Sequence, residues 1–135
     1  MKFVIGADED RPVVAFVASR LRDKGHDVRV VPVATWARVA IDVARAVAGG
    51  DADQGIVCCW TGTGVAMAAN KVKGVRAALC VDAQTAAGAR KWNDANVLAL
   101  SLRLASEPVA AEIVDAWLAE SYGGTEDESL ARLLV

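Results

Sequence analysis

A short segment near the middle of the chain, Cys59-Trp60-Thr61-Gly62-Thr63-Gly64, combines a thiol, two hydroxyls and two glycines. It follows an unbroken apolar run that ends at Cys59, and it leads into Ala-rich residues with helical periodicity. The glycines allow a ligand to approach the backbone closely, while the threonines and amides supply donors to one concavity. A thiolate in this place would be a base near neutral pH. The segment therefore predicts a small-ligand site that stabilises an anion or an oxygen becoming anionic.

The same residues also allow a structural interpretation. A Gly-Thr-Gly turn is compatible with tight packing alone, and we expect Cys58 and Cys80 to be buried core thiols. The spacing matches neither the dinucleotide fingerprint nor the P-loop. The single histidine, His26, lies in a polar Lys-Gly-His-Asp sequence that is typical of a turn. Nucleophile arrangements that need a histidine and His-rich zinc sites are therefore excluded, so we expect no metal site.

β-Branched runs alternate with Ala-rich helical segments along the chain, which is the pattern of βαβ units. Strands are expected at 2–7, 28–33, 55–59, 76–81 and 96–101, and helices at 12–25, 37–48, 64–72, 84–91 and 107–122. This order predicts an α/β fold, a three-layer α/β/α sandwich around a five-stranded, mostly parallel, Rossmann-like sheet. Ligands bind such sheets beyond the carboxyl ends of the strands. The residues expected at that edge are Asp8, Thr35, Trp36, Cys59 to Gly64, Asp82 and Ser101 to Arg103.

Length and composition favour a single domain over residues 1–135. Hydrophobic residues make up 54% of the chain and charged residues 24%, which excludes a disordered polypeptide. The net charge is −2 without any block of like charges, so we expect neither a nucleic-acid nor a membrane partner. Three cysteines, two of them adjacent, do not suit a disulfide framework. With no signal-like or membrane-spanning segment, these features predict a cytoplasmic location.

Residues 123–135 form a tail in which an acidic patch precedes several apolar side chains. These side chains are Leu130, Leu133, Leu134 and Val135. A tail of this composition is too apolar to remain in water, so we expect it to pack on a second subunit.

Three segments, 55–71 (GIVCCWTGTGVAMAANK), 74–80 (GVRAALC) and 93–98 (NDANVL), form a specific combination with Asp8 and with 113–118 (IVDAWL). Over nearly the whole chain, this combination resembles ribose-5-phosphate isomerase B and the related galactose-6-phosphate isomerase subunits. The resemblance implies interconversion of aldose and ketose phosphates through an enediolate, without metal or cofactor. It also implies a homodimer or tetramer whose sites take residues from two subunits.

The resemblance assigns a role to each matching residue. Cys59 matches the cysteine that moves the proton between two carbons, and Thr61 with the amides of residues 62–65 matches the pocket for the developing oxyanion. Asp8 matches an aspartate near the ring oxygen and hydroxyls of the sugar. Asn93 matches an asparagine that contacts substrate from the partner subunit.

The chain departs from the family at the groups that open and grip the sugar phosphate. Glu9 stands where the family commonly has a histidine, and Trp92 replaces the histidine credited with ring opening. Thr125 and Ser129 fall near the family's phosphate-binding arginines, among acidic residues. The usual phosphate grip is therefore missing.

Trp36, Trp60 and Trp92 accompany these losses. We expect all three at the carboxyl edge of the sheet, where they favour a smaller or more apolar pocket. The fourth, Trp117, is expected in the core of the last helix. The predicted catalytic residues are Cys59, Thr61 and Asp8, and the predicted substrate-binding residues are Glu9, Trp36, Trp60, Gly62, Thr63, Gly64, Val65, Trp92 and Asn93.

Three functions remain open on the sequence alone. The first is a cofactor-independent isomerase that enolises a small hydroxy-carbonyl substrate lacking the usual phosphate grip. The second is a sugar-phosphate isomerase with rewired phosphate binding through Arg11, Arg38, Arg90 or Arg103. The third is a ligand-binding homologue without catalysis.

Overall fold

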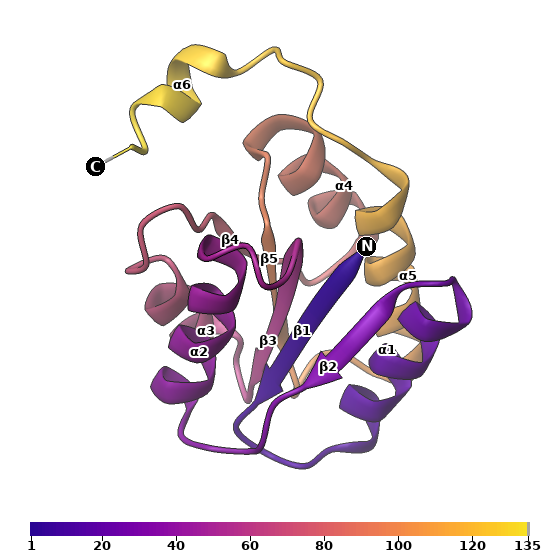
Figure 1. Ribbon diagram of the computed structural model, residues 1–135. Helices are drawn as coiled ribbons and strands as arrows, with labels where there is room; N and C mark the ends of the chain where they lie inside the picture. Colours follow the sequence, from indigo (N-terminus) through magenta and orange to yellow (C-terminus); the bar gives the residue numbers. More distant parts are fainter. Residues whose placement is uncertain (135) are drawn as a thin grey trace.

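The computed structural model describes residues 1–134, which form a parallel five-stranded sheet covered by helices on both faces (Figure 1). The strands are β1 (Lys2–Ala7), β2 (Asp27–Val30), β3 (Gln54–Cys59), β4 (Ala77–Leu79) and β5 (Val97–Ser101). The helices are α1 (Pro12–Asp23), α2 (Trp36–Ala48), α3 (Thr63–Ala69), α4 (Ala83–Asn93), α5 (Glu107–Ala119) and α6 (Asp127–Ala131). The strand order is β2-β1-β3-β5-β4, and each neighbouring pair is parallel. The predicted α/β/α sandwich is confirmed.

Alternation along the buried strands divides the core into two layers. Ile56 and Cys58 of β3 face the layer built with α1, α4 and α5, whereas Val57 and Cys59 face the layer built with α2 and α3. Trp117 of α5 is 1% exposed, and its indole donates to Gln54 Oε1 at 2.7 Å. Its predicted place in the core is correct, and its one polar atom is satisfied.

Several elements are shorter than the sequence pattern predicts. β2 ends at Val30, just before Pro32, which has no amide hydrogen to continue a ladder. Helix α5 ends at Ala119, because Glu120 is already extended (φ −115°, ψ 153°). Beyond it, the Tyr122 hydroxyl donates to Asp127 Oδ1 at 2.7 Å and accepts from the Glu126 amide at 2.9 Å. Tyr122 thus bonds residues of the tail and is not part of α5, so the predicted helix over 107–122 is too long.

The order in which strands are added to the sheet reverses between β1 and β3. From β1 the chain crosses to β2 on one side, and it later returns to β3 on the other side. The loops after β1 and β3 therefore diverge, at the position where proteins of this architecture bind ligands in a crevice. The connecting helices run back against the strands, so α4 ends at the opposite, amino edge, where the tail and α6 also lie (Figure 1).

No helix within residues 1–134 is long and apolar enough to cross a membrane. Val135, which belongs to the predicted tail, lies outside the described residues.

Candidate active site

The loop after β3 depends on a glycine in a conformation that other residues rarely adopt. Gly62, the N-cap of α3, has φ 77° and ψ −13°, in the left-handed region. A Cβ added there would lie 2.5 Å from Leu79 Cδ1 and 3.0 Å from the backbone of Leu100 and Ser101. The loop therefore packs directly on the end of β5, and only glycine fits.

The same loop leaves several donors open. Within residues 1–134, the amides of Gly62, Thr63, Gly64 and Val65 donate to no acceptor. The hydroxyls of Thr61 and Thr63 are 2.8 Å apart and share one hydrogen bond, and both residues are exposed. Open amides beside two hydroxyls are suited to an oxygen that acquires negative charge.

Ser101 anchors this loop to the end of β5. The sequence placed Ser101 at the sheet edge but did not predict this structural role. Its buried hydroxyl donates to the Trp60 carbonyl at 3.0 Å and accepts from the Leu104 amide at 3.3 Å. The Arg103 amide also donates to the Trp60 carbonyl, at 3.0 Å. A buried serine at the end of a strand next to the candidate loop is the signal that would have indicated this.

Asp8 lies one position beyond the last paired residues of β1 and β3, which places it next to Cys59 in register. Its amide donates to the Cys58 carbonyl at 3.2 Å. Its Oδ1 is buried and has no hydrogen-bond partner among the described residues. Burial, and then the charge of Glu9, raise the pKa of the Asp8 carboxyl. An unsatisfied buried acceptor of this kind is a candidate contact for a substrate hydroxyl.

The three cysteines occupy different environments. Cys58 and Cys80 face the layer formed with α1, α4 and α5, and burial raises the pKa of each thiol to about 12. Cys59 faces the other layer at the very end of β3, and it is 5% exposed. Only Cys59 is therefore adjacent to both the open loop and Asp8.

Glu9, Arg11 and Trp60 form a cluster where the segments that follow β1 and β3 come into contact. Arg11 Nε donates to Glu9 Oε2 at 2.8 Å, and the Arg11 guanidinium carbon lies 5.0 Å from the centre of the Trp60 ring. The carboxylate at position 9 therefore holds an arginine.

Trp36 reaches the same crevice from the first turn of α2. A Cβ added to Gly64 would lie 2.9 Å from Trp36 Cε3, so the indole packs directly on the glycine loop. Trp36 and Trp60 are nearly half exposed, and the predicted place of both at the carboxyl edge is correct. They leave two aromatic side chains on the glycine loop after β3 to contact a ligand.

The predicted position of Trp92 at the carboxyl edge is wrong. Trp92 and Asn93 end α4, a helix that runs antiparallel to the strands, so they lie at the amino edge. Trp92 folds back on its own helix, where a Cβ added to Gly88 would lie 2.8 Å from Trp92 Cζ3. These two residues cannot reach Cys59 of the same chain.

At the amino edge, Trp92 and Asn93 line a pocket together with Glu126, Ser129, Leu130 and Leu133 of the tail. The candidate residues thus divide into two groups on opposite edges of one chain. We call Asp8, Glu9, Trp36 and residues 59–65 the carboxyl-edge group, and Trp92 and Asn93 the amino-edge group.

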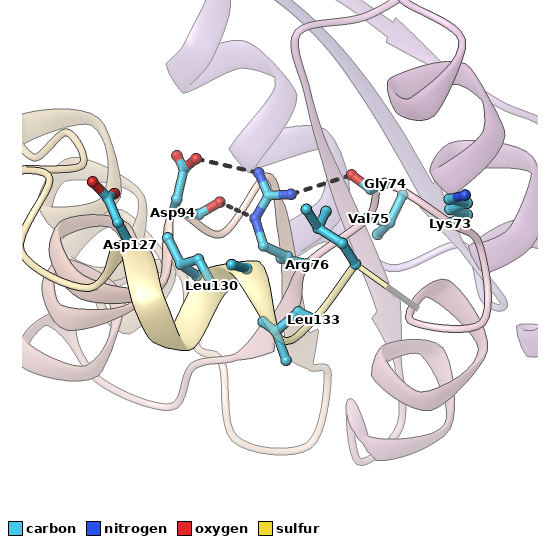
Figure 2. A pocket seen from close by; sticks show the side chains of 10 residues that line it. Lys73, Gly74, Val75, Arg76, Asp94, Asp127, Leu130 and Leu133 are labelled. Atoms are coloured by element: carbon cyan, nitrogen blue, oxygen red, sulfur yellow. Dashed lines mark hydrogen bonds and ion pairs between the residues drawn. The ribbon is translucent and has the colours of Figure 1, made fainter.

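A second pocket, under α6, is lined by Lys73 and by an arginine and an aspartate that bond each other (Figure 2). Arg76 Nε donates to the Asp94 carbonyl at 2.8 Å, and its terminal nitrogens lie 3.4 Å from Asp94 Oδ2 and from the Gly74 carbonyl. Leu130 and Leu133 of the tail close the other side. This pocket is where the tail rests on the amino edge, and its arginine is already bonded to Asp94 and to the Gly74 carbonyl.

Two other residues have structural roles. Asn70, in the segment that resembles the family, bonds both backbone groups of Ala77 through its side chain, at 2.8 and 2.9 Å. Arg90, one of four possible phosphate ligands, donates to the Ala95 carbonyl and lies over the Trp117 ring. Within residues 1–134 no cluster of three or more His, Cys, Asp or Glu side chains is arranged to hold a metal ion.

The fold is that of a doubly wound α/β protein, and the carboxyl-edge group lies at its strand-order reversal, where proteins of this architecture bind small molecules. The family model for Ribose/Galactose Isomerase matches residues 3–133, and this chain belongs to that family.

Relatives agree over most of the chain. Ribose-5-phosphate isomerase B of Escherichia coli is 41% identical over 115 residues, 80% of this chain and 76% of that protein. The solved ribose-5-phosphate isomerase B of Clostridium thermocellum superposes with a TM-score of 0.94 at 36% identity, covering 98% of this chain and 95% of that one. The Mycoplasma genitalium enzyme, solved with bound ribulose-5-phosphate, gives a TM-score of 0.92 at 34% identity, over 98% and 93% of the two chains. The predicted family and isomerase class are confirmed.

Proposed function

We propose that this protein interconverts an aldose and a ketose by proton transfer through Cys59, on a small hydroxy-carbonyl substrate held without the family's usual phosphate grip. Membership of a family of sugar-phosphate isomerases supports the reaction class. The observation that carries the proposal for this chain is the juxtaposition at the β1 and β3 ends. A buried, unpartnered Asp8 oxygen lies beside Cys59 and a loop with open amides.

The chemistry follows from these groups. The Cys59 thiolate removes the proton from the hydroxyl-bearing carbon next to the carbonyl. The electron pair of the broken C–H bond forms the new C=C bond, and the π pair of the carbonyl moves onto its oxygen. The resulting enediolate is stabilised by Thr61 and by the amides of residues 62–65. The Cys59 thiol then returns the proton to the former carbonyl carbon. Asp8 accepts a hydrogen bond from a substrate hydroxyl and moves the proton between the two oxygens.

An open-chain substrate fits this arrangement best. Trp92 occupies the position at which the family has its ring-opening histidine, and an indole donates a hydrogen bond but cannot accept a proton. Substrates that are already open, or that open readily in water, need no such group. A four-carbon 2-ketose, or a four-carbon aldose whose O4 carries a phosphate, cannot close even a five-membered ring, so such sugars are the natural first test.

The amino-edge group enters the site from a second copy of the chain in this proposal. Trp92 and Asn93 lie on the opposite edge from Cys59, so only a partner subunit can bring them to it. The partly exposed apolar tail beside them, with Leu133 57% and Leu134 72% exposed, is the surface proposed to contact that partner.

A sugar phosphate with rewired binding is the second candidate. The Arg11 guanidinium lies over the Trp60 ring, and the Arg103 backbone amide bonds the Trp60 carbonyl, so two arginines stand in the segments around the candidate loop, and this favours an anionic substrate. Arg90 no longer supports this candidate, since its guanidinium is already bonded to the Ala95 carbonyl.

The test is proton exchange with solvent. The purified protein is incubated in D2O with a panel of four- to six-carbon aldoses and ketoses, each with and without a terminal phosphate, and deuterium incorporation and ketose formation are followed by NMR. We expect exchange at the carbon next to the carbonyl for at least one member and none with Cys59→Ser. Cys58→Ser, in the adjacent position on the opposite layer, is the matched control. Absence of exchange across the panel would instead favour a non-catalytic homologue.

A further inference from the structure

We infer that Arg11 binds an anionic end group of the substrate, a phosphate or a carboxylate, and thereby selects which sugars this enzyme accepts. The inference rests on the proposed isomerase function and names the residue that would replace the missing tail arginines.

The Arg11 guanidinium is held by two contacts of different kinds. Its Nε donates to Glu9 Oε2 at 2.8 Å, and its plane lies near the Trp60 ring, with 5.0 Å between the guanidinium carbon and the ring centre. The first contact fixes one edge of the guanidinium, and the second restrains its face. A side chain that ordinarily loses much rotamer freedom on binding is therefore already ordered.

The remaining edge of the guanidinium is open. Within residues 1–134 the two terminal nitrogens of Arg11 have no hydrogen-bond or ion-pair partner, and the side chain is 42% exposed. Two parallel N–H groups at that edge match the spacing of two oxygens of a carboxylate or phosphate. Glu9 is bonded through Nε, so it orients the fork without occupying it.

The position of Arg11 suits the end of a short substrate. It lies three residues after Asp8 on the loop that follows β1, and Trp60 directly follows Cys59 on the loop that follows β3. The Arg11–Trp60 contact thus joins the loop after β1 to the loop after β3. A substrate whose reacting carbons lie at Cys59 extends its other end toward this bridge.

Other cationic groups do not offer an equivalent fork. Arg90 and Arg76 are bonded to backbone carbonyls and lie near Asp94. Arg38 and Arg103 are exposed, and no contact among the described residues orients their guanidinium groups. At the tail, Thr125 and Ser129 are accompanied by Glu126, Asp127 and Glu128, which repel an anion.

Binding of simple anions tests Arg11 without requiring the true substrate. Inorganic phosphate and malonate are titrated calorimetrically into the full-length protein, into Arg11→Gln and Arg11→Lys, and into Arg45→Ala as a control that removes an exposed arginine from the far end of α2. We expect the dissociation constant for both anions to rise about 10- to 100-fold in Arg11→Gln. Arg11→Lys, which keeps the charge but not the fork, should recover only part of the affinity. Arg45→Ala should bind as the unaltered protein does.

Kinetics then connect the anion site to selection. With a substrate from the exchange panel, Arg11→Gln should raise KM for the phosphorylated member about 10- to 100-fold and leave KM for its unphosphorylated counterpart unchanged. An equal loss for both members would show a structural role and overturn the inference. Loss of phosphate binding in Arg103→Gln but not in Arg11→Gln would overturn it too, as would an unaltered protein that binds neither anion.

Failure of the proposed function gives a different result. If phosphate binds and the binding is lost in Arg11→Gln, but no sugar exchanges its proton, then the anion site stands and the isomerase proposal fails. If proton exchange is lost in Cys59→Ser while Arg11→Gln binds both anions as the unaltered protein does, then the isomerase proposal stands and this inference fails.

Discussion

The indole of Trp36 lies on Gly64, so close that a Cβ at position 64 would be 2.9 Å from the ring. One aromatic side chain from the start of α2 therefore sets the position of the glycine loop at the start of α3. The contact joins two segments that are far apart in sequence, and it leaves no room for even a methyl group.

Gly64→Ala tests this contact. Since the alanine methyl must displace the indole, we expect kcat/KM to fall about tenfold, and the intrinsic fluorescence of the protein to change as Trp36 moves. In a Trp36→Ala background the same substitution should have little effect, because the obstructing ring is gone. Gly123→Ala, at a position with nothing within 4 Å, is the matched control. Additive effects of the two substitutions would contradict the proposed coupling.

Thiol labelling distinguishes Cys59 from the other two cysteines. Burial raises the pKa of the Cys58 and Cys80 thiols to about 12, so at pH 8 only about one in ten thousand of either is a thiolate. A small alkylating reagent should therefore modify Cys59 first, as read by peptide mapping after limited reaction. Cys59→Ser should abolish both the early label and the exchange activity. Earlier labelling of Cys58 or Cys80 would remove the basis for assigning proton transfer to Cys59.

Mixing two inactive variants tests whether a site needs two chains. Cys59→Ser removes the carboxyl-edge group's base, and Asn93→Ala removes a member of the amino-edge group. Heterodimers formed from equal amounts should contain one intact site each, which restores about a quarter of the unaltered activity after random exchange of subunits. Each variant alone should remain inactive. If the mixture also stays inactive while subunit exchange is verified by mass, the shared site is refuted.

Removal of residues 125–135 tests the role of the tail in assembly. Since Leu133 and Leu134 are largely exposed in the single chain, we expect their loss to weaken self-association about tenfold or more, as measured by sedimentation over a range of concentrations. Glu128→Gln should associate normally, because within residues 1–134 the Glu128 side chain pairs only with Arg132 at the end of α6. A full-length protein that sediments as a monomer at all concentrations would contradict the interface.

Ribose 5-phosphate should be a poor substrate. The positions of the ring-opening histidine and of the phosphate-binding arginines hold Trp92, Thr125 and Ser129, and loss of one acid–base group alone costs about 10²- to 10⁴-fold. A coupled assay should give a turnover below about 0.1 per second, against roughly 10 per second for an ordinary enzyme. Turnover at the ordinary rate would show that this chain grips and opens the sugar by other means.

Local sequence information was enough to predict the sandwich, the family and the position of Cys59 directly before the glycine loop. Hydrophobic periodicity and glycine placement depend on neighbours a few residues away, so they can be interpreted locally. The same local information placed Trp36, Trp60 and Asp8 correctly, because each directly follows or closely precedes a well-patterned element.

Residues whose partners lie in other elements could be placed only from the folded structure. The direction in which α4 runs puts Trp92 at the amino edge, and the packing of α4 on α5 places Arg90 over Trp117. Likewise, Asn70 bonds the backbone of Ala77, and Arg11 reaches Trp60, across gaps that no periodicity encodes. The reason is physical: a polar side chain takes whichever acceptor or ring the folded chain brings within reach, and that choice is made between elements rather than within them.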